Sequence, residues 1–177
     1  MNAPVPIEKR PDAVWTAAHT KARCEKVVAR YCDSHSIAHY LPLQRRAKRY
    51  QRRTVETWIP MFPGYIFVQL APEMHTILLQ SHRIAAILPI NATAEERLIE
   101  ELRQIQRLEA AAREVELVVQ PEIIEGKAVT VTAGPLRGVT GVVQRRLKLT
   151  RVVVNVDILG QSVAAELDIG EVTTEEA

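Results

Sequence analysis

The final third of the chain consists of short segments rich in β-branched residues, separated by glycine and proline, and this pattern constrains the fold most. Valine and threonine lose side-chain freedom in a helix and pack well on a pleated sheet, so each segment predicts a strand. Roughly four or five short strands are too few for a sandwich and favour a small barrel. The predicted strands are 129–132, 139–143, 152–156 and 163–169, with turns at Gly134-Pro135, Gly138, Gly141 and Leu159-Gly160-Gln161.

The sequence before Gln120-Pro121 mixes helical and strand patterns, which is typical of an α+β domain. We therefore expect two domains joined by a linker. The predicted ranges are a flexible N-terminus over 1–12, an N-terminal domain over 13–113, a linker over 114–121 and a barrel domain over 122–177.

Within the N-terminal domain, apolar spacing predicts several strands and helices. Strands are expected over 14–19, 54–59, 65–70 and 84–88, an extended segment over 37–43, and helices over 21–35, 72–81 and 93–113. The last helix carries an apolar stripe at Leu98, Leu102, Ile105, Leu108 and Ala112. Thr93-Ala94-Glu95-Glu96 reads as a capping box that starts this helix.

Composition excludes several classes of protein. The chain has 177 residues, 47% of them hydrophobic and 25% charged, which is ordinary for a globular protein. No apolar run is long enough to cross a bilayer, and the first residues carry no signal-peptide core. With two cysteines and no export signal, a disulfide framework is improbable, and we expect the chain in the cytoplasm. We also expect a monomer with no membrane partner.

The net charge is only +2, yet six cations gather between positions 45 and 53 with no acid among them. Such a cluster is usually a solvated surface, but it also suits contacts with phosphate groups. Both interpretations stay open on the residues alone. The cluster comprises Arg45, Arg46, Lys48, Arg49, Arg52 and Arg53.

Three aromatic residues, Phe62, Tyr65 and Phe67, gather on or near one surface of a predicted strand. Aromatic stripes are usually core, and the alternative is a hydrophobic docking surface.

Catalytic and metal-binding motifs are not found in the sequence. Cys24, Cys32, His35 and His39 invite a zinc site, but small buried thiols and surface histidines explain the set more simply. The chain has no phosphate-binding loop, no nucleophile elbow and no His-Glu-x-x-His motif. The sequence therefore predicts a protein that is not an enzyme and needs neither cofactor nor metal.

Two sets of motifs resemble the NusG family of transcription factors. The first comprises Trp15 to Lys26 with a Lys-x-x-x-Glu pattern, Tyr40-Leu41-Pro42-Leu43, and Met61-Phe62-Pro63-Gly64-Tyr65-Ile66-Phe67-Val68, and it is similar to the NusG N-terminal (NGN) domain. The second comprises Gly126 to Val131, Gly134-Pro135-Leu136-Arg137-Gly138 and Gly141-Val142-Val143, and it resembles the KOW motif. Leu136 stands where the family more often has phenylalanine.

The resemblance implies an α+β fold: an NGN domain with an antiparallel sheet flanked by helices, followed by a small SH3-like KOW β-barrel. It also implies that His19, Phe62, Tyr65 and Phe67 receive the clamp helices of RNA polymerase, and that the cation cluster faces DNA of the elongation complex. The barrel is then expected to recruit a ribosomal protein or a termination factor. The implied function is processivity or antitermination, by suppressing pausing or termination. The alternative is a KOW-type RNA- or ribosome-binding module that does not bind polymerase.

His75-Thr76 is similar to an element of RfaH, a specialised paralogue, that touches the polymerase's opposite jaw; Ile77 departs from it. The dipeptide therefore suggests an RfaH-like paralogue, with a solvent-exposed His75 as the alternative. RfaH has a C-terminal domain that also folds as a helical hairpin. This chain is expected not to do so, because valines and the Gly134-to-Gly141 turn residues disfavour a helix.

Overall fold

The computed structural model describes residues 5–50, 53–111, 117–120, 128–131, 135–146, 149–167 and 172–174. The chain divides into two compact units. Unit 1 comprises Met1–Leu43 and Ile59–Glu100, and unit 2 comprises Gln44–Trp58 and Glu101–Ala177. The cation cluster and the second half of the long helix thus group with the C-terminal strands, not with the predicted N-terminal domain.

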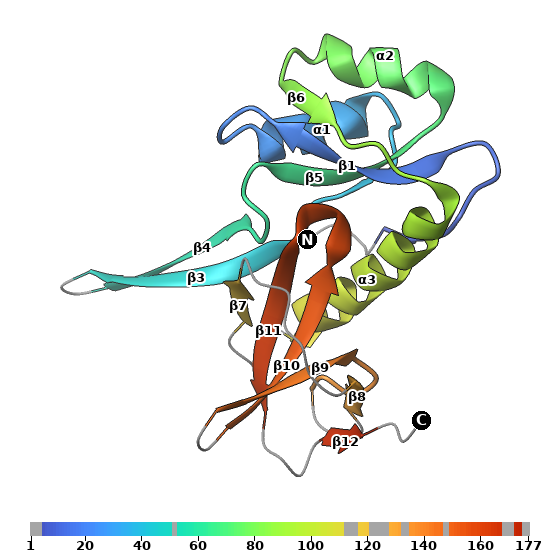
Figure 1. Cartoon of the computed structure of the whole chain (residues 1–177). Helices are drawn as coiled ribbons and strands as arrows, with labels where there is room; N and C mark the ends of the chain where they lie inside the picture. The colour runs from blue at the N-terminus through green and yellow to red at the C-terminus, as the bar shows by residue number, and fades with distance from the viewer. Residues whose placement is uncertain are drawn as a thin grey trace. The chain divides into compact units, whose positions relative to one another are not determined.

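Unit 1 is built on a four-stranded antiparallel sheet in the order β2-β5-β1-β6 (Figure 1). Its strands are β1 (Val14–Thr20), β2 (His39–Tyr40), β5 (Tyr65–Leu70) and β6 (Ile84–Ile87). Its helices are α1 (Glu25–Ser34), α2 (Pro72–Gln80) and the first half of α3 (Ala92–Ala111). The predicted α+β architecture of an antiparallel sheet flanked by helices is confirmed.

One face of this sheet is covered by α1 and α2. Because side chains alternate along a strand, Ile66, Val68 and Leu70 of β5 point to the same side. They form a buried cluster with α1 and α2 side chains, including Val28, Cys32 and Leu78. Ile37 belongs to the same cluster. Leu70 and Ile37 are each 3% exposed and the other buried members are fully buried, so this cluster is an apolar core of unit 1.

The burial of Cys32 predicts that the two cysteines differ in reactivity. Burial raises the pKa of the Cys32 thiol to about 12, so the reactive thiolate is scarce at neutral pH. Cys24 is only partly buried. We expect a thiol reagent to label Cys24 in the folded protein and Cys32 only after denaturation, as counted by mass spectrometry. Equal labelling of both cysteines in the folded chain contradicts the packing of α1.

The other face of the sheet carries alternate residues of β1 and β5. Across the two strands, Trp15 pairs with Gln69, Ala17 with Phe67 and His19 with Tyr65. The backbone amide of Trp15 donates to the buried carboxylate of Glu95 on α3 over 2.9 Å. Trp15 itself is fully buried. This face is therefore closed at the Trp15 end, and its other end carries the ring pair of His19 and Tyr65.

The segment before β1 has no helix or strand, but specific contacts hold it. Ile7 is buried, and the carbonyl of Glu8 accepts hydrogen bonds from the Trp15 indole and the Gln69 amide. Lys9 pairs with Glu96 of α3 at 2.7 Å. A flexible lead-in was the expectation from composition, and the structure shows residues 5–13 bound along the sheet and α3.

Helix α3 begins earlier than its sequence motif predicts. The side chain of Asn91 accepts from the amide of Ala94 at 2.8 Å, which is the hydrogen bond of an N-cap residue. The predicted capping box is therefore wrong: Thr93 lies inside the helix, and Glu96 pairs with Lys9. Asparagine competes well with threonine as an N-cap, and the choice depends on where the chain enters the helix. The predicted stripe of Leu98, Leu102, Ile105 and Leu108 is buried, and Ala112 lies outside the described residues.

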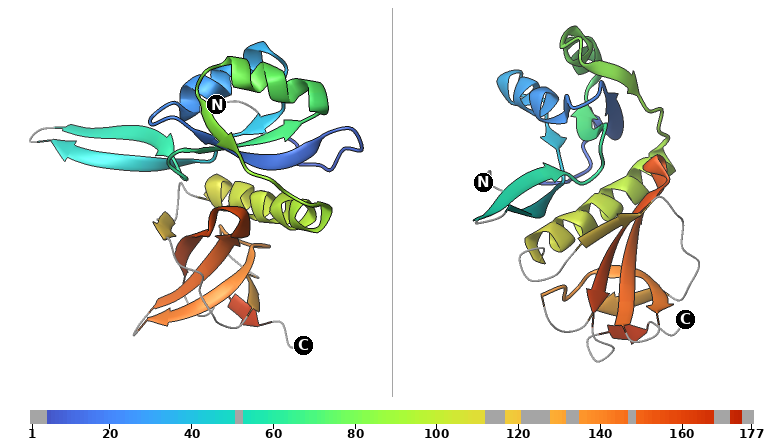
Figure 2. Two further views of the ribbon diagram at one scale, coloured as in Figure 1. Left: turned by 45° about the horizontal axis from the view of Figure 1, so that its top comes forward. Right: turned by 90° about the vertical axis from the view of Figure 1, so that its left-hand side faces the viewer.

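Unit 2 contains a six-stranded antiparallel sheet and most of a two-stranded hairpin, whose ends at Leu43 and at Ile59–Pro60 belong to unit 1. The hairpin pairs β3 (Leu43–Tyr50) with β4 (Arg53–Pro60), and Figure 2 shows it as a two-stranded ribbon. The sheet has the order β12-β8-β9-β10-β11-β7. Its strands are β7 (Leu117–Gln120), β8 (Ala128–Val131), β9 (Thr140–Arg146), β10 (Leu149–Val156), β11 (Gln161–Leu167) and β12 (Val172–Thr174).

Strand β7 lies inside the stretch predicted as a linker. It pairs along β11, with Val119 opposite Val163 and Val118 opposite Ala164. The predicted strands of the C-terminal third are confirmed, and its described residues form strands, turns and one short 3-10 helix at Asp157–Leu159. Val131, Val139, Val154, Val156 and Val163 are buried together with Leu136 in this unit.

Candidate functional site

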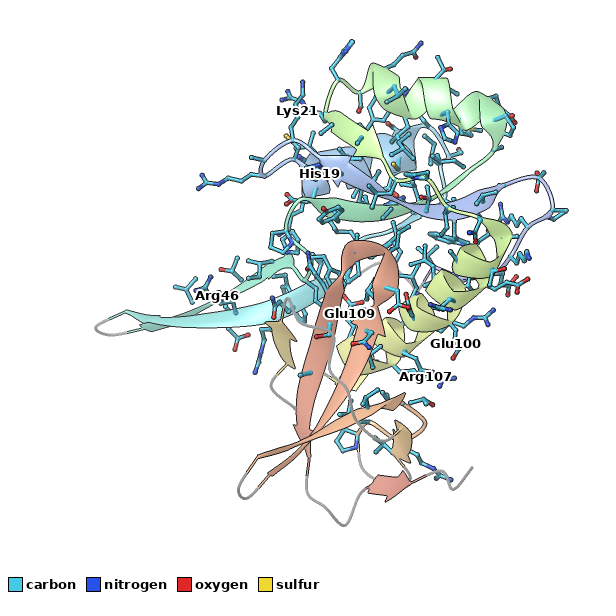
Figure 3. All side chains as sticks on the ribbon, viewed as in Figure 1. His19, Lys21, Arg46, Glu100, Arg107 and Glu109 are labelled. Atoms are coloured by element: carbon cyan, nitrogen blue, oxygen red, sulfur yellow. The ribbon has the colours of Figure 1, made fainter. Side chains whose placement is uncertain are left out.

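The exposed end of the second sheet face carries two stacked rings. His19 lies next to the end of β1, and Tyr65 opens β5 directly opposite it. Their ring centroids are 5.0 Å apart with an interplanar angle of 26°. His19 is exposed and Tyr65 is half-buried, so the pair presents polarisable ring surface to solvent. Figure 3 marks His19 on β1.

The turn before Tyr65 is fixed by hydrogen bonds on both sides of Gly64. The amide of Gly64 donates to the carboxylate of Glu25 at 2.6 Å, and its carbonyl accepts from the amide of Thr20 at 2.7 Å. Gly64 has a φ of +86°, which L side chains rarely adopt, and a Cβ there lies 3.5 Å from the His19 ring. The positive φ therefore favours glycine at this turn, and the His19 ring lies in van der Waals range of the position.

Glu25 is a functional candidate that was not singled out from the sequence. Its side chain is only 6% exposed although it opens α1. A buried carboxylate needs hydrogen-bond donors, and the Gly64 amide is one. Glu25 is the glutamate of the Lys-x-x-x-Glu pattern, and that pattern was the sequence signal that could have identified it. Its hydrogen bond joins residues 39 positions apart, so the sequence alone does not predict it.

Phe62 and Phe67 differ from the ring pair in exposure. They meet edge to face with centroids 5.9 Å apart, and Phe62 is 1% and Phe67 0% exposed. The four residues predicted to contact polymerase therefore separate into two pairs: the exposed His19 with the half-buried Tyr65, and the buried Phe62 with Phe67. The structure does not itself test that prediction.

His75 and Thr76, the predicted second polymerase contact, are both exposed on α2. They lie on the helix whose buried side holds Leu78 against the core. A partner can therefore reach them without any change in unit 1.

Four of the six cations in the cluster, Arg45, Arg46, Lys48 and Arg49, lie on β3. Arg45 forms an ion pair with Glu56 of β4 at 3.1 Å, and both side chains are exposed. Arg46 is exposed, and the described part of the chain offers it no ion pair (Figure 3). Lys48 and Arg49 follow on β3 and Arg53 begins β4; Arg52 lies outside the described residues.

The predicted KOW loop combines a buried anchor with exposed neighbours. Leu136 is 1% exposed, whereas Pro135 and Arg137 are exposed and Gly138 has a φ of +84°. Within unit 2, Arg107 of α3 donates to the Gly138 carbonyl, and Gln104 accepts from the Thr140 amide at 3.0 Å. Gly141 lies in β9, and Gly134 lies outside the described residues.

Neither metal ligation nor membrane insertion is indicated. Among the described residues no three His, Cys, Asp or Glu side chains gather as a metal site. Cys32 is buried and Cys24 partly buried, while His35 stacks on Tyr31 with centroids 4.0 Å apart. None of the helices within the described ranges is long and apolar enough to span a bilayer.

Comparison with known proteins gives a family match over more than half of the chain. The family described as "Transcription termination factor nusG" matches residues 13–108. A comparison with curated proteins finds no match. The solved structures that match this chain include two with low sequence identity. "Domain interaction in Thermotoga maritima NusG" has 20% identity and a TM-score of 0.49, covering 93% of this chain and 98% of that one. "Crystal Structure of MjSpt4:Spt5 complex conformation B" has 15% identity and a TM-score of 0.30, covering 92% and 97%. Both TM-scores are below 0.5, so membership of the family rests on the match over residues 13–108.

Proposed function

Because this chain belongs to the NusG family of transcription factors, we propose that it binds RNA polymerase and promotes processive elongation. The observation that carries the proposal is the stacked, solvent-facing pair of His19 and Tyr65 on the sheet of unit 1. Rings held in one position lose little conformational entropy on binding, so they suit a docking surface. The partner surface is the pair of clamp helices of the polymerase.

The proposed mechanism needs no catalytic group. A factor that binds the closed polymerase better than the open one shifts the equilibrium towards the closed form. A preference of about 1.4 kcal/mol changes the ratio of paused to active complexes roughly tenfold. His75 and Thr76 on α2 are proposed to supply a second contact, to the opposite jaw, and that contact produces the preference.

The C-terminal strands are proposed to form the SH3-like KOW barrel and to recruit a ribosomal protein or a termination factor. Two observations support this assignment. The six strands pair antiparallel, with buried valines on β8, β10 and β11, and Pro135 and Arg137 of the loop are exposed beside the buried Leu136.

The direct test is capture of purified RNA polymerase by the immobilised full-length chain. We expect stoichiometric capture, and longer transcripts through pause sites when the chain is added. Capture of ribosomal particles without polymerase contradicts the proposal and identifies the chain as an RNA- or ribosome-binding module instead. The variant Tyr65→Ala, which lacks one ring of the proposed docking surface, serves as the control.

The hairpin of β3 and β4 is proposed to contact DNA of the elongation complex. Its support is the run of cations along β3, of which Arg45 and Arg46 are exposed and Arg45 pairs with Glu56. Phosphate contacts by such side chains release counterions and make binding depend on salt.

The pairing of Arg45 with Glu56 allows a charge-specific prediction. Replacing Arg45, Arg46, Arg49 and Arg52 with alanine is expected to reduce DNA crosslinking in the elongation complex and to lower the salt dependence by about 0.9 per lost phosphate contact. The change Glu56→Gln frees Arg45 and is expected to strengthen crosslinking. Polymerase capture should be unchanged in both variants. If the crosslinking and salt dependence of the fourfold variant equal those of the parent, the hairpin is only a solvated surface.

A further inference from the structure

The outer edge of strand β11 is occupied by a strand that precedes the predicted barrel domain. In the sheet order β12-β8-β9-β10-β11-β7, β7 is the last strand, and it comes from the stretch that the sequence predicts as a linker. It pairs antiparallel with β11, from Leu117 opposite Ala165 to Gln120 opposite Ser162 (Figure 1). We name the side of Ser162–Ala165 that faces β7 the β11 edge. Its backbone groups would lose their strand partner if β7 left.

The β11 edge lacks the features that usually protect an edge strand. Strand β11 pairs with β10 in one continuous register, from Thr150 opposite Leu167 to Val156 opposite Gln161. The residues Ser162–Ala165 include no charged side chain and no proline. Proteins that leave an edge open usually place a charge, a proline or a bulge there. The β11 edge is therefore suited to pairing with another strand.

A partner can approach β11 only along this edge, because both faces of the strand are closed at these residues. Val163 and Ala164 are consecutive, so their side chains point to opposite faces of the sheet. Both are 0% exposed, and so is Ser162. Backbone pairing at the β11 edge is therefore the mode of contact that remains.

Backbone pairing holds β7 less firmly than it holds β10. Four residue pairs join β7 to β11, whereas seven join β10 to β11. As the last strand of the sheet, β7 pairs on one side only. Peripheral elements with few backbone hydrogen bonds open at a lower free energy than the whole domain. Strand β7 can therefore leave the β11 edge while the rest of the sheet stays folded.

We propose that β7 is a built-in gate: it occupies the β11 edge in the resting chain, and an extended strand of a partner protein displaces it. The partner strand that fits is uncharged and rich in β-branched residues, like the Leu-Val-Val-Gln of β7 itself. Backbone hydrogen bonds supply the affinity in this mode of recognition. The proposal rests on the recruiting role proposed for the C-terminal strands, and it adds how their recruiting surface is kept closed.

The covalent connection of β7 to the barrel sets the strength of the gate. A strand in the same chain competes at an effective concentration of about 1 mM, so a free strand of equal intrinsic affinity binds the parent only weakly. Removal of β7 from the edge is therefore expected to raise the affinity for an added strand.

The test uses the full-length chain and a fluorescent peptide that copies residues 115–121, Val-Glu-Leu-Val-Val-Gln-Pro. The variant V118P/V119P cannot keep β7 paired, because proline lacks the amide that a strand donates. By fluorescence anisotropy, it is expected to bind the peptide at least about tenfold more tightly than the parent does. The matched control V118T/V119T keeps β-branched residues in β7 and should bind the peptide like the parent.

Hydrogen exchange in the parent tests the gate without any substitution. Along β11, successive backbone amides point alternately to β7 and to β10. The amides of the β11 edge are expected to exchange at least about tenfold faster than those facing β10, because β7 opens locally. If both sets exchange only with global unfolding, β7 is a permanent strand of the sheet and the gate is wrong.

The other outcomes are equally decisive. Equal peptide affinity for the parent and for a V118P/V119P variant that circular dichroism shows to be folded contradicts the gate. If V118P/V119P forms dimers and does not bind the peptide, the β11 edge accepts a second copy, and the assignment to a partner strand is overturned. Polymerase capture by the parent is measured separately. Its failure contradicts the proposed function and leaves the peptide and exchange results unchanged, so the two failures are distinguishable.

Discussion

Replacing Tyr65 with alanine is expected to weaken polymerase binding by about 30-fold, which corresponds to roughly 2 kcal/mol for a central aromatic contact. The ring is half-buried and stacks on His19, so its removal costs contact area without opening the core of unit 1. The measurement is affinity for purified polymerase, with circular dichroism and thermal unfolding to show that the fold is intact. Unchanged affinity in a folded variant contradicts the docking assignment.

Phe67→Ala is the matched comparison, because Phe67 lies two residues along the same strand and is fully buried against Phe62. We expect it to lower the free energy of unfolding by about 3–5 kcal/mol, the usual cost of removing a buried phenylalanine. Tyr65→Ala should lower it by much less. If both variants lose the same stability, Tyr65 is a core residue and the exposed ring pair has no separate role.

Replacing Glu25 with alanine is expected to lower the free energy of unfolding by about 2 kcal/mol and to weaken polymerase binding as well. The Gly64 amide then loses a charge-assisted hydrogen bond inside the protein, and such bonds contribute about 1.5–3 kcal/mol. The turn that positions Tyr65 loses its support from α1. Urea unfolding and polymerase affinity are measured on the same preparations.

Two further variants separate this role from a general effect of charge. Glu25→Gln keeps an oxygen that accepts from the Gly64 amide, so most of the stability and affinity should return. Glu73→Ala removes an exposed carboxylate from the start of α2 and should change neither quantity. If Glu25→Ala keeps both its stability and its affinity, Gly64 and Tyr65 do not depend on Glu25.

Much of the secondary structure was predictable from the sequence because it depends on local periodicity. The alternation in Tyr65–Leu70 and the β-branched runs of the C-terminal third correspond to β5 and to strands β8 to β11. The stripe from Leu98 to Leu108 repeats at the helical period and is buried. The family motifs around Trp15 and Pro63-Gly64 also depend on order along the chain, and the family match covers both.

Short-range signals were less reliable where two neighbouring residues compete for one role. Asparagine and threonine are both favoured N-cap residues, and in the structure Asn91, not Thr93, caps α3. Leu117–Gln120 was predicted as part of a linker, yet it is a strand because the edge of β11 is available to it. Neither outcome is decided by the residue itself, since both depend on the position of a partner elsewhere in the chain.

The sequence by itself determined the family, the α+β character of unit 1 and the positions of most elements, because these follow from residue type and spacing. Only the tertiary structure decided which candidate residues face solvent. It buried Phe62 and Phe67, left His19 and Tyr65 at an open end of the sheet, and paired Arg45 with Glu56. It also joined Lys21 to Arg83 and Glu25 to Gly64. Such contacts link residues far apart in the chain, and exposure and pairing are properties of the neighbours that folding brings together.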